Sequence, residues 1–490
     1  MKKLFIKKIA AVGILGITAI ACDLDTVNKA VLPPDVALAD STGFKATVFS
    51  AYERVNDFAY YGQVQIIQPE VMADNMVIVN NTGRFVQQSV NAVGSHMNRW
   101  GTDDGLTTLP TGRYVPINEC NFVINKIDEL ATVTEAQKNR LKGEAYFLRA
   151  LNYFDLLRIY GYEPGREVNG FNLGVILRTE PVEKASDADL RERATNVEGY
   201  QLVEADLLQA INLLPVPAPV ANTVTSYPYR ATKQAAHALL SKVYLYWGKY
   251  GDASTQADLA LGFSNGPLTT TANFIASWSA TPHPESFFES QIPVADWSSV
   301  DGANESLHSV TMNLLAGSQY VVAASDELIA AHEAGDIRRN LYDNVPGAGP
   351  AGTQGKYRCK KWPGGGGGSF VENIPIIRRA DVMLISAEGK ARSNDENGAR
   401  TMLNALRAAR GLAAASDSGQ ALLDLLLNER RVELAFEGNR WFDLKRLGKD
   451  ITKPAALNVP ILPYSDFRVL SRIPVDQVVL NPHLRQNPGY

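Results

Sequence analysis

The sequence predicts an all-α fold, in which tetratricopeptide-like helical hairpins build a single large globular body with long irregular loops. Three observations support this prediction. Apolar residues recur at helical spacing over residues 134–160, and residues 231–261 and 377–409 each consist of two helical stretches joined by a polar turn. Residues 55–115 and 262–370 are instead rich in Gly, Asn, Ser, Pro, Thr and aromatic residues. We expect these two irregular regions to be functional loops, because long loops in compact proteins are commonly functional and the aromatic content argues against plain disorder.

Residues 134–160 form the clearest predicted helix. Thr134 and Gln137 have the spacing of a capping box, in which each side chain binds the backbone N–H group of the other residue. Apolar residues at positions i, i+4 and i+7, starting from Phe147, lie on one helical face. Gly161 is expected to end this helix in a left-handed conformation, which glycine adopts without strain.

Helix–turn–helix units follow. After a helix over residues 197–214, residues 231–261 form two helices around the turn Gly248–Asp252, and residues 377–409 repeat this design around the turn Ser393–Asn397. Alanine is frequent on the contact faces, and its small side chain lets helix axes approach closely, as in tetratricopeptide units. A generic α-helical bundle without a repeat is the alternative, because the full repeat pattern is not matched.

The N-terminus has the features of an export signal. The first 21 residues contain four lysines and no acidic residue, and the lysines are followed within that stretch by a run of 12 uncharged residues that are apolar apart from Thr18. Such a run suits a signal peptide and is too short to span a bilayer. The run ends at Ala19-Ile20-Ala21-Cys22, which resembles a bacterial lipobox. We therefore predict a lipoprotein signal peptide over residues 1–21, lipid attachment at Cys22, a tether over 22–40 and a helical body over 41–490. The alternative is plain secretion after cleavage near Ala21.

Composition and motifs argue against several functional classes. The net charge of −4 becomes more negative once the N-terminal lysines are removed, so nucleic acid is not an expected partner. The six histidines lack paired metal-ligand spacing, and no HExxH or GxSxG motif is present. We therefore predict no metal, no cofactor and no catalytic residue. A surface glycosidase stays open as an enzymatic alternative, because two carboxylates suffice for glycoside hydrolysis. Cys120 and Cys359 could pair or stay as two separate thiols.

Several strings in the chain resemble one family. Residues 373–388 read NIPIIRRADVMLISAE, residues 428–448 read NERRVELAFEGNRWFDLKRLG, and the chain closes with NPGY. An earlier string, AYFLRALNYFDLLRIYG over residues 145–161, completes the pattern. Together they resemble the SusD/RagB family of outer-membrane nutrient-binding lipoproteins. One departure is Gly389, which follows Glu388 where the family often has alanine; a glycine inside a helix costs about 1 kcal/mol.

The resemblance implies a function. A SusD-like lipoprotein binds a nutrient at the cell surface and delivers it to a SusC-like TonB-dependent outer-membrane transporter. It breaks no bond in the nutrient. The resemblance thus implies a protein that is not an enzyme, that is lipid-anchored in the outer membrane and that faces the cell exterior. The expected ligand is an oligosaccharide. Peptide cargo is the main alternative within the family, and a helical-repeat scaffold that binds only protein is another.

Candidate ligand-binding residues come from the two irregular regions. Sugars present C–H faces that stack on aromatic rings, and hydroxyl groups that pair with planar polar side chains. The residues that we select on these grounds are Asp74, Arg84, Asn98, Trp100 and Tyr320. For each of them the alternative role is burial or loop stabilisation.

The charged string around Trp441 has two interpretations. Glu429, Arg430, Arg431 and Glu433 lie on a helix with a strong apolar face, and such charges tolerate burial only when they are paired. The string is either a ligand platform or a structural corner that locks the C-terminal helix to the bundle. Dense ion pairs beside buried aromatic residues favour the structural corner.

Overall fold

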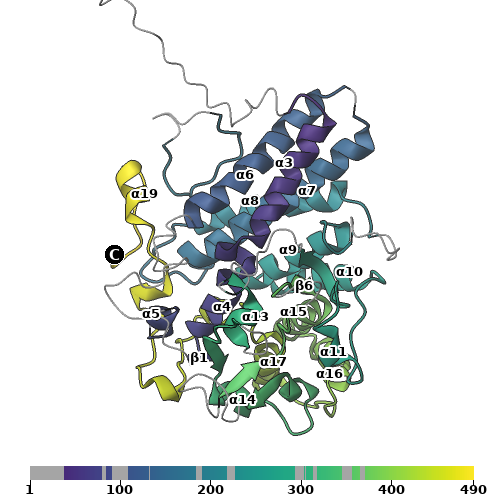
Figure 1. Cartoon of the computed structure of the whole chain (residues 1–490), viewed down its shortest axis with the longest axis vertical. Coiled ribbons are helices and arrows are strands. Elements are labelled where there is room, and N and C mark those ends of the chain that lie inside the picture. Colours follow the sequence, from purple (N-terminus) through teal and green to yellow (C-terminus); the bar gives the residue numbers. More distant parts are fainter. Residues whose placement is uncertain are drawn as a thin grey trace, which may run out of the picture.

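Four long helices lie side by side in one half of the molecule (Figure 1). They are α3 (Ser41–Asn56), α6 (Leu109–Lys126), α7 (Glu135–Tyr160) and α8 (Asn196–Leu213). The structure is a computed structural model, and it describes residues 38–79, 84–90, 109–131, 133–183, 190–217, 227–292, 303, 305–312, 317–344, 356–364 and 370–490.

The helical stack continues into the other half of the molecule. Helix α9 (Lys233–Trp247) packs on α8 and forms an antiparallel hairpin with α10 (Tyr250–Leu261). Helix α10 packs on α15 (Arg379–Arg392), which in turn contacts α16 (Glu396–Ala409) and α17 (Gly419–Leu434). Each helix therefore packs against its neighbours in the stack, as the predicted tetratricopeptide-like hairpins require. The predicted fold class is confirmed.

Helix α7 begins where the sequence predicts and ends differently. Thr134 and Gln137 form the expected capping box. The predicted left-handed end at Gly161 is wrong, because this residue is extended, with φ −126° and ψ 161°. The chain leaves α7 alongside Leu173, and a Cβ atom on Gly161 would lie 3.1 Å from the Leu173 carbonyl oxygen. Gly161 thus allows the end of α7 to lie close to the backbone of Leu173. The predicted apolar face is confirmed, since Phe147, with the residues at i+4 and i+7, is buried.

Small residues bring α10 and α15 together. Ala253, Ala257 and Ala260 of α10 are all fully buried. Helix α15 continues through Gly389, where a Cβ atom would lie 2.6 Å from the Tyr250 carbonyl oxygen at the start of α10. The departure from alanine at this position is therefore explained by the close approach of the two helices.

Two small antiparallel sheets, which the sequence did not predict, occur in the described part of the chain. One pairs β2 (Ser286–Ser290) with β6 (Ile374–Arg378). The other has the order β1-β3-β5-β4 and consists of Met76–Ile78, Val322–Ala324, Tyr357–Cys359 and Tyr342–Asn344. The second predicted hairpin corresponds to α15 and α16, and residues 377 and 378 at its predicted start belong to β6. Pairing with β2, which is distant in sequence, decides this conformation.

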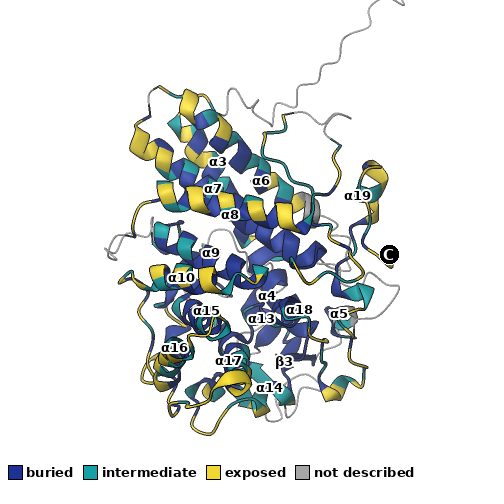
Figure 2. Cartoon of the chain, turned by 180° about the vertical axis from the view of Figure 1, so that it is seen from behind, coloured by how far each residue is buried: buried dark blue, intermediate teal, exposed yellow. Residues whose placement is uncertain are grey.

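The predicted irregular regions contain short elements as well as loops. The remaining described elements are η1 (Phe58–Gly62), α4 (Val64–Val71), α5 (Val86–Val90), η2 (Ile127–Glu129), α11 (Phe274–Ser277), α13 (Leu307–Thr311), α14 (Asp326–Ala330), η5 (Ile337–Leu341), α18 (Arg440–Arg446), η6 (Ala455–Leu457), η7 (Phe467–Val469) and α19 (Val475–Leu480). Figure 2 shows that the buried residues concentrate where these elements meet the long helices. Among the described helices, none has both the length and the apolar character needed to cross a membrane.

Candidate functional site

Arg84 occupies a half-buried position between three segments. Its Nη1 atom donates to Oε1 of Gln319 at 2.7 Å, and its Nη2 atom donates to Oε1 of Gln63. The guanidinium group lies 5.7 Å from the ring centroids of both Phe58 and Phe85. Gln63 in turn donates to the carbonyl oxygen of Glu305 at 2.8 Å. We call Phe58, Gln63, Arg84, Phe85 and Gln319 the Arg84 cluster. It combines aromatic rings with planar polar groups, as predicted for a sugar-binding face.

Tyr320 lies beside this cluster in sequence but is fully buried. Its ring packs with Val77, Val79 and Ala323, and its backbone N–H donates to the Ser309 carbonyl oxygen at 2.7 Å. Burial raises the pKa of its hydroxyl group. The ligand contact stays a prediction for Tyr320, and its buried ring favours the alternative role in packing.

Asp74 is held by the C-terminal third of the chain. Arg440 donates through Nε and Nη2 to the two carboxylate oxygens at 2.6 and 2.8 Å, and Thr452 donates its hydroxyl at 2.7 Å. Arg431 lies 3.4 Å away. Burial by itself would raise the pKa of Asp74, but the hydrogen bonds and charge of Arg440, with the charge of Arg431, lower it to about 2. The ligand contact stays a prediction here also, and the geometry favours an internal ion pair.

The other predicted site residues lie outside the described residues. Asn98 and Trp100 belong to the segment between α5 and α6, and Cys22 belongs to the N-terminal segment. Their predicted roles therefore stay predictions. Cys120 and Cys359 are described, and both are buried free thiols.

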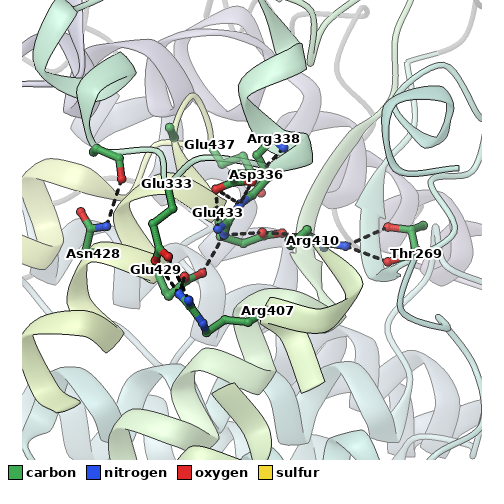
Figure 3. Close-up of polar contacts among 12 residues, drawn as sticks. Thr269, Glu333, Asp336, Arg338, Arg407, Arg410, Asn428, Glu429, Glu433 and Glu437 are labelled. Carbon is green, nitrogen blue, oxygen red and sulfur yellow. Dashed lines mark hydrogen bonds and ion pairs between the residues drawn. The ribbon is translucent and has the colours of Figure 1, made fainter. Parts of the chain in front are cut away.

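The charged string around Trp441 builds a buried ion-pair network (Figure 3). Glu433 of α17 accepts hydrogen bonds from Arg378 and Arg410 at 2.7 and 2.8 Å, and from Arg338 at 3.2 Å. These side chains are all essentially inaccessible to solvent. Burial by itself would raise the pKa of Glu433, but the charges of Arg410 and Arg378 hold that pKa well below its usual range. Glu429 joins the network by pairing with Arg338 at 2.9 Å.

A second set of ion pairs follows the same string into α18. Arg430 binds Asp381 at 2.7 Å and Asp443 at 2.8 Å, and Arg446 binds Glu388 at 2.7 Å. These pairs join α17 and α18 to α15. The network therefore behaves as the structural corner that the sequence favoured, because its charges are paired with one another in the interior.

Comparison with known proteins identifies the family. Residues 38–245 match a SusD-like family described as "Starch-binding associating with outer membrane", and residues 342–490 match the SusD family. The chain belongs to the SusD/RagB family. The second match contains the charged string from Glu429 to Arg446, whose side chains build the buried corner.

Individual relatives agree with this assignment. A SusD-like protein P2 from Formosa agariphila is 23% identical over 530 residues, which cover 97% of this chain and 98% of the relative. A SusD superfamily protein of known structure from Bacteroides thetaiotaomicron has a TM-score of 0.78 at 24% identity, covering 91% of this chain and 99% of that one. A putative sugar binding protein from Bacteroides vulgatus has a TM-score of 0.77 at 24% identity, covering 92% and 98%.

SusD-like proteins are binding proteins, and their family is associated with the outer membrane. Within the described residues, no group of three or more His, Cys, Asp or Glu side chains is arranged to hold a metal ion. The sequence interpretation missed four members of the Arg84 cluster, which are Phe58, Gln63, Phe85 and Gln319. Their polar or aromatic character was visible in the irregular regions, but only the fold places them beside Arg84.

Proposed function

We propose that this SusD/RagB protein is a lipid-anchored, outer-membrane surface protein that binds an oligosaccharide and delivers it to a SusC-like TonB-dependent transporter without chemical change. The observation that carries the proposal of a ligand-binding face is the Arg84 cluster. The side chains of Phe58, Arg84 and Gln319 are half-buried there. Gln63 and Phe85, which also contact Arg84, are buried.

The chemistry of the cluster suits a carbohydrate. Gln63 and Gln319 each accept a hydrogen bond from Arg84, so its planar donor group is fixed in orientation before a ligand arrives. A fixed donor loses less conformational entropy on binding than a mobile one. Sugar hydroxyl groups pair with planar donors, and sugar C–H faces pack on aromatic rings. The relative from B. vulgatus, named as a sugar binding protein, supports the same ligand class.

Peptide cargo is the second candidate. A guanidinium group also binds carboxylates and backbone carbonyl oxygens, so the Arg84 cluster does not by itself distinguish the two ligand classes. The test is a glycan and peptide array with residues 23–490, followed by calorimetry on each ligand that binds. Binding of peptides and of no glycan would refute the oligosaccharide proposal.

The role of Arg84 is tested with a matched pair of variants. Arg84→Ala should weaken binding of the array-selected ligand at least tenfold, since a buried hydrogen bond to a charged group contributes about 1.5–3 kcal/mol. Arg392→Ala is the control, because Arg392 also contacts an aromatic ring, at 5.0 Å from the Tyr250 centroid, but lies on the hairpin side of the molecule. Equal affinities of the two variants would exclude Arg84 from the site. Trp100→Ala should also weaken binding, while leaving the melting temperature nearly unchanged.

Delivery to a transporter is tested separately. The intact lipoprotein should co-purify from outer membranes with a TonB-dependent barrel, and the isolated body should leave candidate polysaccharides uncleaved. Turnover of a polysaccharide by the pure protein would instead favour a glycosidase.

A further inference from the structure

An apolar pocket that shares no lining residue with the Arg84 cluster lies between the end of α7 and the C-terminal segment. Its lining residues are Tyr114, Leu156, Tyr160, Gly174, Val175, Ile176, Arg193, Ile473, Gln477 and Leu484. Most of these side chains are apolar, and no carboxylate is among them. The hydroxyl group of Tyr114 is already bound to the Ile176 carbonyl oxygen at 2.7 Å. Arg193 is therefore the single charged group in the pocket lining.

Arg193 is a buried cation with no acidic partner among the described residues. Its side chain donates to the carbonyl oxygens of Gly174 at 2.7 Å, Tyr160 at 2.9 Å and Arg485 at 3.0 Å, and to Oδ1 of Asn487 at 2.8 Å. These acceptors satisfy its N–H groups but leave its positive charge uncompensated. The other buried arginines described above, such as Arg378 and Arg430, all pair with carboxylates. Arg193 differs from them in this respect.

A second guanidinium group lies near that of Arg193. Arg193 and Arg485 lie 5.5 and 5.7 Å from the centroid of the same ring, that of Phe171. Burial and the nearby charge of Arg485 lower the pKa of Arg193 to about 10. Arg485 and the carboxylates closest in sequence, those of Glu192 and Asp476, are exposed to solvent. The buried charge at the pocket is therefore that of Arg193, and the pocket walls are mostly apolar.

We propose that this pocket binds an aliphatic carboxylate, with its chain against the apolar lining and its charge near Arg193. An apolar wall alone would accept any aliphatic chain, and a cationic surface alone would accept any anion. The combination selects an amphipathic anion, because burial of the chain and attraction of the charge act together. This site is separate from the proposed carbohydrate site.

Helix α19 extends the apolar surface beyond the pocket. Gln477 of this helix lines the pocket, while Val475, Val479 and Leu480 are exposed by 47%, 75% and 70%. Figure 2 shows α19 at the edge of the molecule with much of its surface exposed. A longer chain can therefore reach further apolar surface. Affinity should rise with chain length, by up to about fourfold for each additional buried methylene group.

Calorimetry on the soluble body, with three probes of matched chain length, tests the proposal. Octanoate should bind at least tenfold more tightly than octanol, and octylammonium should bind most weakly of the three. The expected order follows from the sign of the pocket charge. If octanol or octylammonium binds as tightly as octanoate, or if octanoate does not bind at millimolar concentration, the proposal is refuted.

A pair of variants isolates the charge at a fixed position. Ile176 is a half-buried lining residue, so Ile176→Gln and Ile176→Glu differ in charge and hardly in size. Ile176→Glu should bind octanoate at least tenfold more weakly than Ile176→Gln, because its carboxylate repels the ligand. Equal affinities in two folded variants would contradict the proposal. If Ile176→Glu does not fold, the comparison of the three probes on the wild-type protein still tests the proposal.

Discussion

Neutralising Glu433 should be among the most destabilising conservative substitutions in this protein. Glu433→Gln keeps the size and shape of the side chain but removes its negative charge. The wild-type carboxylate is fully buried and contacts Arg338, Arg378 and Arg410. The network joins five basic groups to six acidic ones, of which Glu333 is partly exposed; they are Arg338, Arg378, Arg407, Arg410 and Lys361 with Glu285, Glu333, Asp336, Glu429, Glu433 and Glu437. The substitution therefore removes the carboxylate that three buried arginines share.

The expected cost is about 3–5 kcal/mol, which is the range for removing one partner of a buried ion pair. An unfolding entropy of about 2.1 cal/mol/K per residue gives roughly 0.9 kcal/mol/K for a body of this length that unfolds as one unit. The melting temperature should consequently fall by about 3–5 °C. Chemical denaturation should show the same loss as a lower midpoint with an unchanged slope.

A matched control uses the same substitution at an exposed ion pair. Glu129, whose side chain is 69% exposed, lies 3.6 Å from Lys126, and Glu129→Gln should cost less than about 1 kcal/mol. Calorimetry and guanidinium denaturation of both variants at pH 7 provide the comparison. A loss of stability in Glu433→Gln no greater than in Glu129→Gln would refute the idea that the family string acts as an ion-paired structural corner.

Further predictions concern pH and the membrane anchor. Burial by itself would raise the pKa of Asp74, Glu285 and Glu388, but contacts with arginines lower each pKa to about 2. Each carboxylate therefore stabilises the fold at pH values above its unfolded-state pKa. Denaturation curves should show the free energy of unfolding falling as pH drops from about 5 to about 2. Unchanged stability down to pH 2 would contradict these ion pairs. Burial raises the pKa of Glu372 to about 8, so its carboxyl group destabilises the folded state increasingly as pH rises from about 5 to about 8. The Glu372→Gln variant should therefore be more stable than the wild type at pH 8. This difference in stability should disappear near pH 5. An equal difference at both pH values would argue against a neutral buried carboxyl group. Cys22→Ala should move the protein from the membrane fraction to the soluble fraction, and continued membrane attachment in cells that lack the transporter would contradict lipidation.

Local features of the helices could be predicted from short stretches of sequence. The capping box of Thr134 and Gln137 forms as expected, because its two residues are only three positions apart. The short strands could not be predicted in the same way. Strand β6 has five residues and depends on pairing with β2, nearly ninety positions earlier in the chain. Nothing local in the string distinguishes a strand from the first turn of the following helix.

The candidate site shows the same division. The sequence identified Arg84 as a polar residue in an aromatic-rich region, and the structure adds Gln63 and Gln319, the latter more than 200 positions away. Asp74 was selected on the same chemical grounds as Arg84. Its partner Arg440 lies 366 positions later, so only the folded chain could bring that cation to the carboxylate.

The sequence by itself determined the helical hairpins, the family and the requirement that the charges around Trp441 be paired. These conclusions depend on spacing within a helix and on the cost of burying an unpaired charge, and both can be evaluated from neighbouring residues. The tertiary structure alone decided which charges pair, which polar residues stay accessible, and that Arg193 has no acidic partner within the described chain. Those outcomes depend on contacts between distant segments, because the electrostatic environment of a side chain is set by whatever the fold packs against it.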